Sequence, residues 1–416
     1  MVQIYRRKWQ KGFFSSLLGY LRDSIVLFLP IKKLPSFFVK ILYGEPIHFA
    51  FLVHPRAYQD IFISSPFLKP LQFLFRKKSA IGAFFGANPF VLNKVHSLQG
   101  INGLVVALMT MPELMFEKRK KAEKRLLAAL KLISKIGGPG TVVGLGGWWP
   151  MVTQRGLSIK EHAEKMGLLV TNGHCGTLAS IYLTIEKVAR IGKLEKGDLC
   201  IAIIGVGKMG TNVARALNGR VKKMILIDIN EANLKKIKRS LEGQNPKTLI
   251  DVIVSNPENM NALKEMLRDC HIGVCATSSL RNLLKLRDLP YGFIAIDDSR
   301  PEALPRDPKN ERIVLEGGLL KICGATIDYD FGFGKDDNVF GCLGEAFLLA
   351  LDRQQKLKPT LGDVDMENFF KVLDFCCANG VTAGDLKSSD VSIAEADIEA
   401  AFERRKYFKP EETAHD

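Results

Sequence analysis

The sequence predicts a two-domain α/β protein, in which a parallel-sheet domain is inserted between two parts of a second α/β domain. Its 416 residues are about two to three times an average domain. Apolar runs of strand length alternate with segments whose apolar residues recur at helical spacing. A glycine-rich motif at residues 205–210 stands between such a run and such a segment. The predicted parts are a basic amphipathic segment (1–46), the first part of the outer domain (47–180), the inserted domain (181–325), and the rest of the outer domain with a C-terminal helical part (326–408).

Composition limits the environment and the partners of the chain. The eight cysteines form no CxxC pair, which argues against a zinc site and a disulfide scaffold and favours a reducing cytoplasm. The 59 basic and 44 acidic side chains give a net charge of +15, which favours an anionic partner. No nucleic-acid-binding motif is present. An acidic carrier protein or an anionic membrane surface is therefore favoured over nucleic acid.

Residues 1–46 mix aromatic, aliphatic and basic side chains. Their longest uncharged runs, residues 12–21 and 24–31, are far shorter than the roughly 20 residues of a membrane-spanning helix. No small-residue cleavage site follows, so a secretory signal is not expected. One or two amphipathic helices are predicted, broken at Pro30 and Pro35. Two interpretations stay open: an arm that docks on the core, or an interfacial anchor that holds the protein peripherally on the inner face of the membrane.

The outer domain begins with a buried strand at residues 49–53, which ends before Pro55. Residues 113–136 have helical spacing and predict one long helix that stops at a glycine-rich turn. A further strand is predicted at residues 141–145. Gly146 and Gly147 follow it, at the strand end where ligands gather in open α/β sheets. A purely structural turn is the commoner explanation of two such glycines.

The inserted domain is predicted from the glycine motif and its neighbours. Residues 199–204 are continuously apolar, as in a strand buried on both faces. Gly205 permits a tight turn, Gly207 lets the backbone approach a pyrophosphate, and Gly210 lets the following helix pack closely on the strand. Helix N-terminal amides then face the phosphates. This pattern predicts a Rossmann-like domain that binds a dinucleotide through six motif residues: Gly205, Val206, Gly207, Lys208, Met209 and Gly210.

The second strand of this domain, predicted at residues 223–228, ends in an acid. Asp228 lies 18 residues after Gly210, where a carboxylate bonds the ribose hydroxyls of NAD and repels a 2′-phosphate. We therefore expect NADH to be favoured over NADPH, although nearby lysines offer compensating charge. Further strands are predicted at residues 250–254 and 271–276, and the small polar residues after the latter suit contact with the nicotinamide ribose or form only a turn. Ile229, Thr277 and Ser278 complete the predicted cofactor-binding set.

Cys342 is the thiol best placed for chemistry. It follows Gly341 and opens an apolar segment that reads as a helix. Amides at a helix N-terminus lower the pKa of a thiol and make it a better nucleophile. By position alone, a cysteine among apolar residues is more often an inert part of a core, so a catalytic interpretation needs further support.

A set of collinear motifs resembles the cyanobacterial long-chain acyl-[acyl-carrier-protein] reductases, which form fatty aldehydes. The resemblance covers roughly residues 49–376 and places Cys342 at the family's nucleophile and Glu345 at its acidic neighbour. The matching pieces are residues 49–54, Gly103 with Met111-Pro112-Glu113-Leu114, Leu145-Gly146-Gly147, Thr171-Asn172-Gly173 with Thr177, the glycine motif, Leu315-Glu316-Gly317-Gly318 and residues 341–349.

This resemblance implies that a fatty acyl thioester of an acidic acyl-carrier protein or of coenzyme A is reduced to an aldehyde through an acyl-enzyme on Cys342. Proton transfer by His174 or Glu345 is a hypothesis beside two structural alternatives, a satisfied histidine and an acid that serves the first helical turn. The chain departs from the family pattern in three ways: His174 replaces an asparagine, Asp228 stands where the NADPH-linked family has a basic residue, and residues 1–46 lack an obvious counterpart.

Two other functions remain open from the sequence. The first is a dehydrogenase of another small carbonyl compound, in which Cys342 is structural. The second is a membrane-associated NAD-binding regulator without turnover. Only the thioester reductase is expected to carry an acyl group on Cys342.

Overall fold

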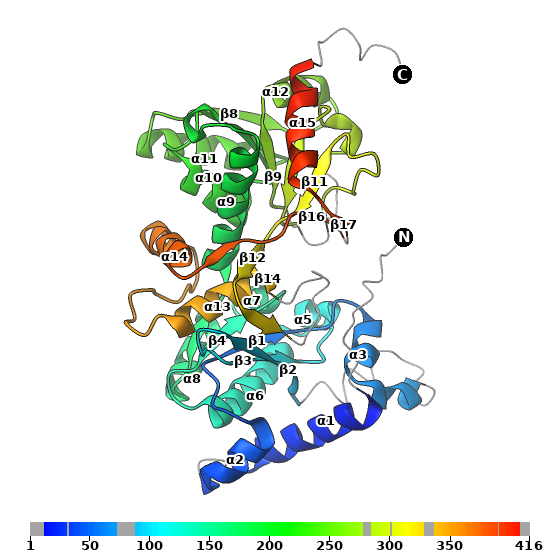
Figure 1. Ribbon diagram of the computed structural model, residues 1–416, viewed down its shortest axis with the longest axis vertical. Helices are drawn as coiled ribbons and strands as arrows, with labels where there is room; N and C mark the ends of the chain where they lie inside the picture. Colours follow the sequence, from blue (N-terminus) through cyan, green and yellow to red (C-terminus); the bar gives the residue numbers. More distant parts are fainter. Residues whose placement is uncertain are drawn as a thin grey trace. The chain divides into compact units, whose positions relative to one another are not determined.

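The computed structural model describes residues 12–30, 33–72, 88–277, 284–299, 302–327, 337–389 and 391–407. The chain divides into two compact units (Figure 1). The first unit consists of residues 1–176 and 322–381. The second consists of residues 177–321 and 382–416. An α/β fold with an inserted parallel-sheet domain is therefore confirmed.

The first unit is built on a six-stranded sheet in the order β13-β2-β3-β1-β4-β5. Its centre is parallel, because β1 pairs in parallel with both β3 and β4, whereas β2 and β13 join antiparallel at one edge. The central strand β1 buries four successive apolar residues, as a strand covered on both faces requires. The strand bounds are β1 Phe49–Val53, β2 Phe90–Ser97, β3 Gly103–Ala107, β4 Val142–Leu145, β5 Leu169–Thr171, β13 Ala325–Ile327 and β14 Asn338–Phe340.

The helices of the first unit differ from the prediction at one place. The single helix predicted over residues 113–136 is wrong, because the segment forms α5 (Pro112–Glu117) and α6 (Arg119–Gly137). Lys118 between them has φ −129° and ψ 52°, outside the helical region. The other helices that lie in this unit are α1 Phe13–Phe28, α2 Ser36–Tyr43, α3 Tyr58–Ser64, η2 Pro66–Gln72, α7 Trp149–Val152, η3 Leu157–Ile159, α8 Lys160–Lys165, α13 Gly341–Leu351 and α14 Met366–Ala378.

The N-terminal segment forms the two predicted helices, with Pro30 and Pro35 between them. Helix α1 packs beside α6 and β2, as the docking interpretation expects (Figure 1). Among the described residues, every helix is too short or too polar to cross a membrane.

The second unit is built on a six-stranded sheet in the order β11-β10-β9-β6-β7-β8, and neighbouring strands run parallel throughout it. Read from the other edge, this is the 3-2-1-4-5-6 order of a Rossmann fold. The predicted strands at residues 199–204, 223–228, 250–254 and 271–276 correspond to the first four in chain order. The bounds are β6 Cys200–Ile204, β7 Lys223–Asp228, β8 Leu249–Val254, β9 Ile272–Cys275, β10 Ile294–Asp297 and β11 Ile313–Glu316.

The C-terminal segment departs from the predicted boundaries. Residues 382–407 fall in the second unit, not with residues 326–381 in the outer domain. The reason lies in α15 (Glu395–Tyr407), where Arg405 donates to the carbonyls of Leu267 and Arg268. The remaining elements are α9 His174–Ile191, which begins in the first unit and ends in the second, with η4 Lys196–Asp198, α10 Lys208–Leu217, α11 Glu231–Gln244, α12 Met260–Arg268, η5 Leu286–Asp288, β12 Leu319–Ile322, β15 Val381–Ala383, β16 Lys387–Ser388 and β17 Val391–Ser392.

Candidate functional site

The glycine loop of the second unit shows why each motif glycine is needed. Gly205 has φ +88°, and a Cβ built on it would lie 2.8 Å from the Cβ of Thr277. A Cβ on Gly210 would lie 2.0 Å from the carbonyl oxygen of Gly205. A Cβ on Gly207 would meet no described atom within 4 Å. The turn is therefore tight and the helix packs closely on it, while the loop tip is open where a phosphate group would approach.

Helix α10 supplies the amides of this loop. It begins at Lys208, and Gly207 caps it without a side-chain hydrogen bond. The first turn of an α-helix carries N–H groups without partners in the helix, and its dipole favours anions. Val206 is buried, whereas Lys208 is exposed and Met209 half-buried at the helix start. These residues fit the pyrophosphate of a dinucleotide.

Asp228 holds the glycine loop against the end of β7. Its Oδ2 accepts a hydrogen bond from the Val206 amide at 2.7 Å, and its Oδ1 accepts one from the Asn230 amide at 3.0 Å. Asn233 donates from Nδ2 to the Val206 carbonyl oxygen at 2.9 Å. Each carboxylate oxygen has a second lone pair, so Asp228 can also accept ribose hydroxyls. Ile229 beside it is 61% exposed.

Asn233 was not among the predicted site residues. A local sequence feature could have pointed to it: Asn230 is the N-cap of α11, and its side chain accepts a hydrogen bond from the Asn233 amide. Thr277 lies at the glycine loop, against Gly205, and its amide donates to the Ser299 hydroxyl at 3.2 Å. Ser278 lies outside the described residues.

Cys342 occupies the first turn of α13 in the first unit. The helix begins at Gly341, and no side chain caps its N-terminus among the described residues. A Cβ built on Gly173, which has φ +75°, would lie 2.2 Å from the Cβ of Cys342. A Cβ built on Gly176 would lie 2.2 Å from the Gly341 carbonyl oxygen. The first turns of α9 and α13 therefore touch beside Cys342, through glycines at both contacts.

Glu345, one turn after Cys342, is 1% exposed. Its Oε2 accepts from the Gly176 amide at 2.8 Å, and its Oε1 accepts from the Thr360 amide at 3.1 Å and from the Thr171 hydroxyl. A buried carboxylate needs such donors to remain in the interior. Glu345 thus ties α13 to the start of α9 and to the segment around Thr360. No sequence signal marked Thr360, which lies 189 residues from Thr171 along the chain.

His174 is the first residue of α9 and lies next to Gly173. Its amide donates to the Asn172 side chain at 2.9 Å. Burial, together with the charge of Arg155, lowers the pKa of His174 to about 4. The imidazole is therefore neutral at physiological pH. The structure brings the three predicted residues Cys342, Glu345 and His174 into one neighbourhood.

Two buried thiols of the first unit, Cys175 and Cys376, differ from Cys342 in their surroundings. Burial raises the pKa of Cys175 well above its usual value, and the nearby Glu345 carboxylate acts in the same direction. Burial likewise raises the pKa of Cys376 to about 12. A raised pKa keeps a thiol protonated and unreactive. Cys342 is half-buried and stands at a helix N-terminus.

The Gly146–Gly147 turn serves the fold. A Cβ on Gly146 would lie 2.7 Å from the Leu52 carbonyl oxygen. His54 Nε2 accepts from the Trp148 amide at 2.9 Å, while Nδ1 lies 3.0 Å from the Pro55 carbonyl oxygen. Burial lowers the pKa of His54 to about 4, so the ring is neutral. These contacts favour the structural interpretation of the two glycines.

With this geometry in place, comparison with known proteins assigns one segment. Residues 201–283 match the TrkA-N domain model. Together with the strand order, this makes the second unit a nucleotide-binding domain of the Rossmann type, a fold found in NAD-dependent dehydrogenases and reductases. No curated protein sequence matches the chain.

Several solved structures are similar at low identity. A dipicolinate synthase chain from Bacillus halodurans is 15% identical with a TM-score of 0.28, over 45% of this chain and 61% of that one. L-Tryptophan dehydrogenase from Nostoc punctiforme is 13% identical with a TM-score of 0.35, over 87% and 89% of the two chains. Shikimate 5-dehydrogenase from Listeria monocytogenes is 10% identical with a TM-score of 0.35, over 79% and 96%. The match therefore spans about three fifths of the dipicolinate synthase chain.

Proposed function

We propose that this protein is an NAD(P)H-dependent oxidoreductase that reduces a long-chain fatty acyl thioester to a fatty aldehyde through an acyl-enzyme on Cys342. The observation that supports the proposal is that the first turns of α9 and α13 meet at Cys342, where Gly173 lies against the Cys342 Cβ. Two helix N-termini favour negative charge at the same place. The resemblance of the motifs around Cys342 to acyl-[acyl-carrier-protein] reductases supports the choice of substrate.

Cys342 acts as the nucleophile in this mechanism. As the thiolate, it attacks the carbonyl carbon of the acyl thioester, and the bond to the carrier sulfur breaks. The carrier leaves as a thiolate and takes up a proton. The helix N-termini stabilise the thiolate before the attack and the negative carbonyl oxygen during it. The small Gly173 lets α9 approach the thiol closely enough for this to occur.

The reduction requires a cofactor. A reduced nicotinamide dinucleotide bound at the glycine loop would supply hydride to the acyl carbon of the enzyme thioester, and the Cys342 thiolate would then leave as the aldehyde forms. Gly207 and the first turn of α10 would hold its pyrophosphate. Asp228 accepts the ribose hydroxyls, which favours NADH over NADPH.

Glu345 and His174 serve the site in different ways. Both oxygens of Glu345 already accept hydrogen bonds from donors of the first unit, so this carboxylate positions α13 relative to α9. His174 is neutral at physiological pH because its pKa is lowered to about 4. A neutral imidazole donates a hydrogen bond from one ring nitrogen and accepts at the other, so His174 acts as a polar contact for the substrate carbonyl.

An acidic acyl-carrier protein or acyl-CoA is the proposed form of the substrate. Both are anionic, and the chain carries a net charge of +15. Opposite charge accelerates the encounter of two macromolecules. The preferred carrier can therefore be identified by comparing how salt changes kcat/KM with acyl-carrier protein and with acyl-CoA.

The proposal is tested by following NADH and NADPH oxidation with a long-chain acyl-carrier protein, acyl-CoA, the free fatty acid and a panel of small ketones. We expect oxidation and stoichiometric aldehyde with the thioesters alone. Turnover with a small ketone and none with a thioester would identify the dehydrogenase of another carbonyl compound. Cofactor binding without turnover of any substrate would identify a regulator.

A further inference from the structure

Helix α1 exposes its apolar side and buries its polar side, the reverse of an ordinary surface helix. Its exposed apolar stripe recurs at helical spacing and consists of Phe14, Leu18, Leu21, Ile25 and Phe28. Its buried residues are Ser16, Gly19, Asp23 and Val26. A water-facing helix of a globular protein places its apolar stripe inward and its polar face outward. The side of α1 that contacts the protein is the small and polar one, and the strongly apolar side is exposed.

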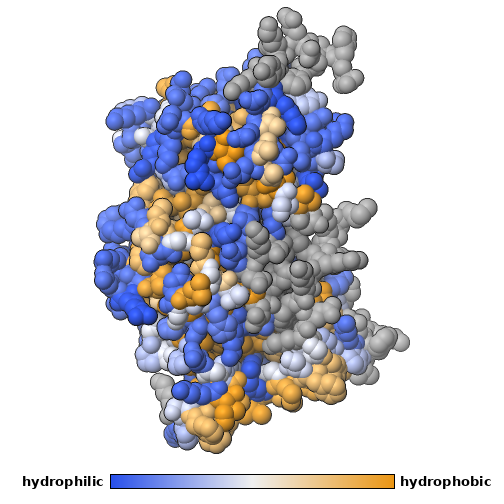
Figure 2. Space-filling model, in the orientation of Figure 1, coloured by the Kyte–Doolittle hydropathy of each residue, from blue (hydrophilic) through white to orange (hydrophobic). Residues whose placement is uncertain are grey.

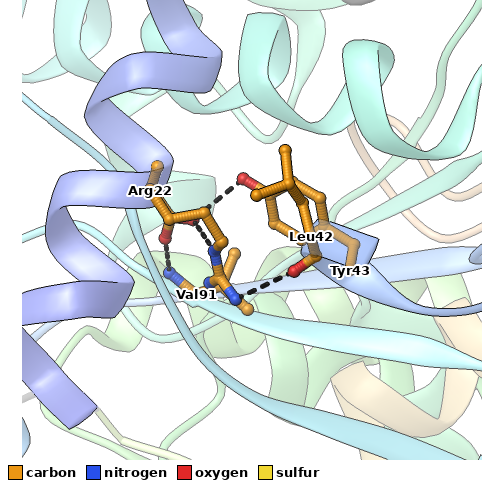
Figure 3. A network of polar contacts seen from close by, with 5 residues as sticks. Arg22, Leu42, Tyr43 and Val91 are labelled. Atoms are coloured by element: carbon orange, nitrogen blue, oxygen red, sulfur yellow. Dashed lines mark hydrogen bonds and ion pairs between the residues drawn. The ribbon is translucent and has the colours of Figure 1, made fainter. Parts of the chain in front are cut away.

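A buried polar network holds α1 in this orientation (Figure 3). Asp23 accepts from the Val91 amide of β2 at 2.7 Å, from the Tyr43 hydroxyl of α2 at 2.9 Å and from Arg22 Nε at 2.8 Å. Arg22 also donates to the Leu42 carbonyl oxygen at 3.3 Å. Because a buried carboxylate is stable only with such donors, rotation of α1 to bury its apolar stripe would break the network.

The C-terminal end of α1 is fixed by a lysine of α6. Lys135 Nζ donates to the carbonyl oxygens of Val26 at 3.1 Å and of Leu27 at 2.9 Å, and also to that of Leu29. A cation at the C-terminus of a helix also compensates its dipole. The exposed face of α1 is thus presented on a fixed helix.

Helix α2 extends the same surface. Phe37, Phe38 and Ile41 are 65%, 50% and 64% exposed. Figure 2 shows hydrophobic side chains gathered over α1 and α2. The α1–α2 face is defined here by eight exposed residues: Phe14, Leu18, Leu21, Ile25, Phe28, Phe37, Phe38 and Ile41. Exposed apolar clusters of this kind mark interaction surfaces.

The positive charge around the α1–α2 face favours an anionic partner. Residues 1–44 contain eight lysines or arginines and one acid, Asp23, and that acid is buried. Lys33 and Lys40 are exposed on the described part of this segment. Two copies of the chain joined by this face would bring two basic segments together. Apolar side chains among cations suit an anionic lipid surface.

We propose that the α1–α2 face binds an anionic membrane surface in the interfacial plane. Helices α1 and α2 insert their aromatic and aliphatic side chains among the acyl chains just below the headgroups. Lys33 and Lys40 contact the lipid phosphates. Helix α1 has 16 residues, about 24 Å at 1.5 Å per residue, and lies along the surface. This inference is independent of the proposed reductase activity.

The test is flotation of the full chain with vesicles of phosphatidylcholine alone or mixed with phosphatidylglycerol. We expect binding to the mixed vesicles, weakened by salt because the charge contribution is screened. The variant Leu18→Gln/Phe28→Gln should lose on the order of tenfold in partition coefficient, since it removes two anchors from the apolar face. These side chains are 65% and 79% exposed, so the protein should remain folded by circular dichroism.

A matched control is present elsewhere on the surface. Leu98 and Leu249 are 88% and 61% exposed, and Leu98→Gln/Leu249→Gln should bind vesicles as the wild type does. Equal binding by the wild type and both variants overturns the proposal. So does a wild type that fails to bind vesicles and dimerises through Leu18 and Phe28, because the face would then join two copies. Neither assay requires turnover, so the outcome is separate from that of the thioester assay.

Discussion

The glycine loop and the Cys342 site are both built where glycines let backbone segments meet, yet they are assembled differently. Three glycines within residues 205–210 shape the loop, and β6 and α10 follow one another along the chain. The Cys342 site joins residues 171–176, 341–345 and Thr360, with Thr171 and Glu345 separated by 174 positions. The spacing of residues along the sequence therefore predicts the glycine loop directly. The Cys342 site could be predicted only from a family resemblance.

The two sites are also stabilised by acids with different exposure. Asp228 is half-buried at the end of a strand and accepts from two backbone amides. Glu345 is fully buried and accepts from two backbone amides and a hydroxyl. The first acid retains access to a ligand, whereas the second holds two helices together. Replacing a glycine at the Cys342 site should therefore reduce thioester turnover without changing cofactor affinity. Replacing a glycine of the loop should have the converse effect.

The largest effect is expected from Gly173→Ala. The new Cβ would lie 2.2 Å from the Cβ of Cys342, so α9 or the thiol must shift. We expect kcat/KM for the thioester to fall on the order of a hundredfold, while NADH fluorescence titration shows nearly unchanged cofactor affinity. Gly138→Ala is the control, because Gly138 has φ +78° and no described atom within 4 Å of its Cβ position. If kcat/KM fell equally in both variants, the effect would come from backbone strain and not from the contact with Cys342.

Gly210→Ala should give the converse result. Its Cβ would lie 2.0 Å from the Gly205 carbonyl oxygen, which pushes α10 away from the loop. We expect NADH affinity to weaken by about tenfold, with the rate of Cys342 alkylation by iodoacetamide preserved. Gly243→Ala in α11, where no described atom lies within 4 Å of the new Cβ, should change neither. A loss of alkylation in Gly210→Ala would contradict the independence of the two sites.

A smaller effect is expected from Asp228→Ser. The substitution removes the charge that repels a 2′-phosphate and the acceptors for the ribose hydroxyls. The ratio of kcat/KM for NADPH to that for NADH should rise by roughly fivefold. Since Asp228 also accepts from the Val206 amide, affinity for both cofactors should weaken slightly. A wild type that already prefers NADPH would show that Asp228 only supports the loop.

The sequence predicted the elements whose signals are local. The glycine motif, the strand over residues 223–228 and the helix that starts at Gly341 were expected and are present. The break of the long helix at Lys118 was missed, because no proline or glycine marks it. Thr360 and its partnership with Glu345 depend on tertiary contacts, for which a single sequence carries no periodic signal.

The burial of the polar face of α1 also depends on tertiary contacts. Hydrophobic periodicity predicted the helix correctly, but it left open whether the apolar stripe faces the core or a membrane surface. The buried face is selected by Asp23, whose three donors lie in α1, α2 and β2. The acid among apolar residues was visible in the sequence, whereas its burial and its hydrogen-bond partners were not.

The central claim is that Cys342 carries the acyl group, and the most direct measurement is intact-protein and peptide mass spectrometry after incubation with a long-chain acyl thioester in the absence of NAD(P)H. We predict one added acyl mass, located on the peptide that contains Cys342, and its release as aldehyde when NADH is added. Cys175→Ala should still form this adduct, since Cys175 is buried with a raised pKa, whereas Cys342→Ala should not. Normal aldehyde formation by Cys342→Ala, or an adduct on another residue, would contradict the account.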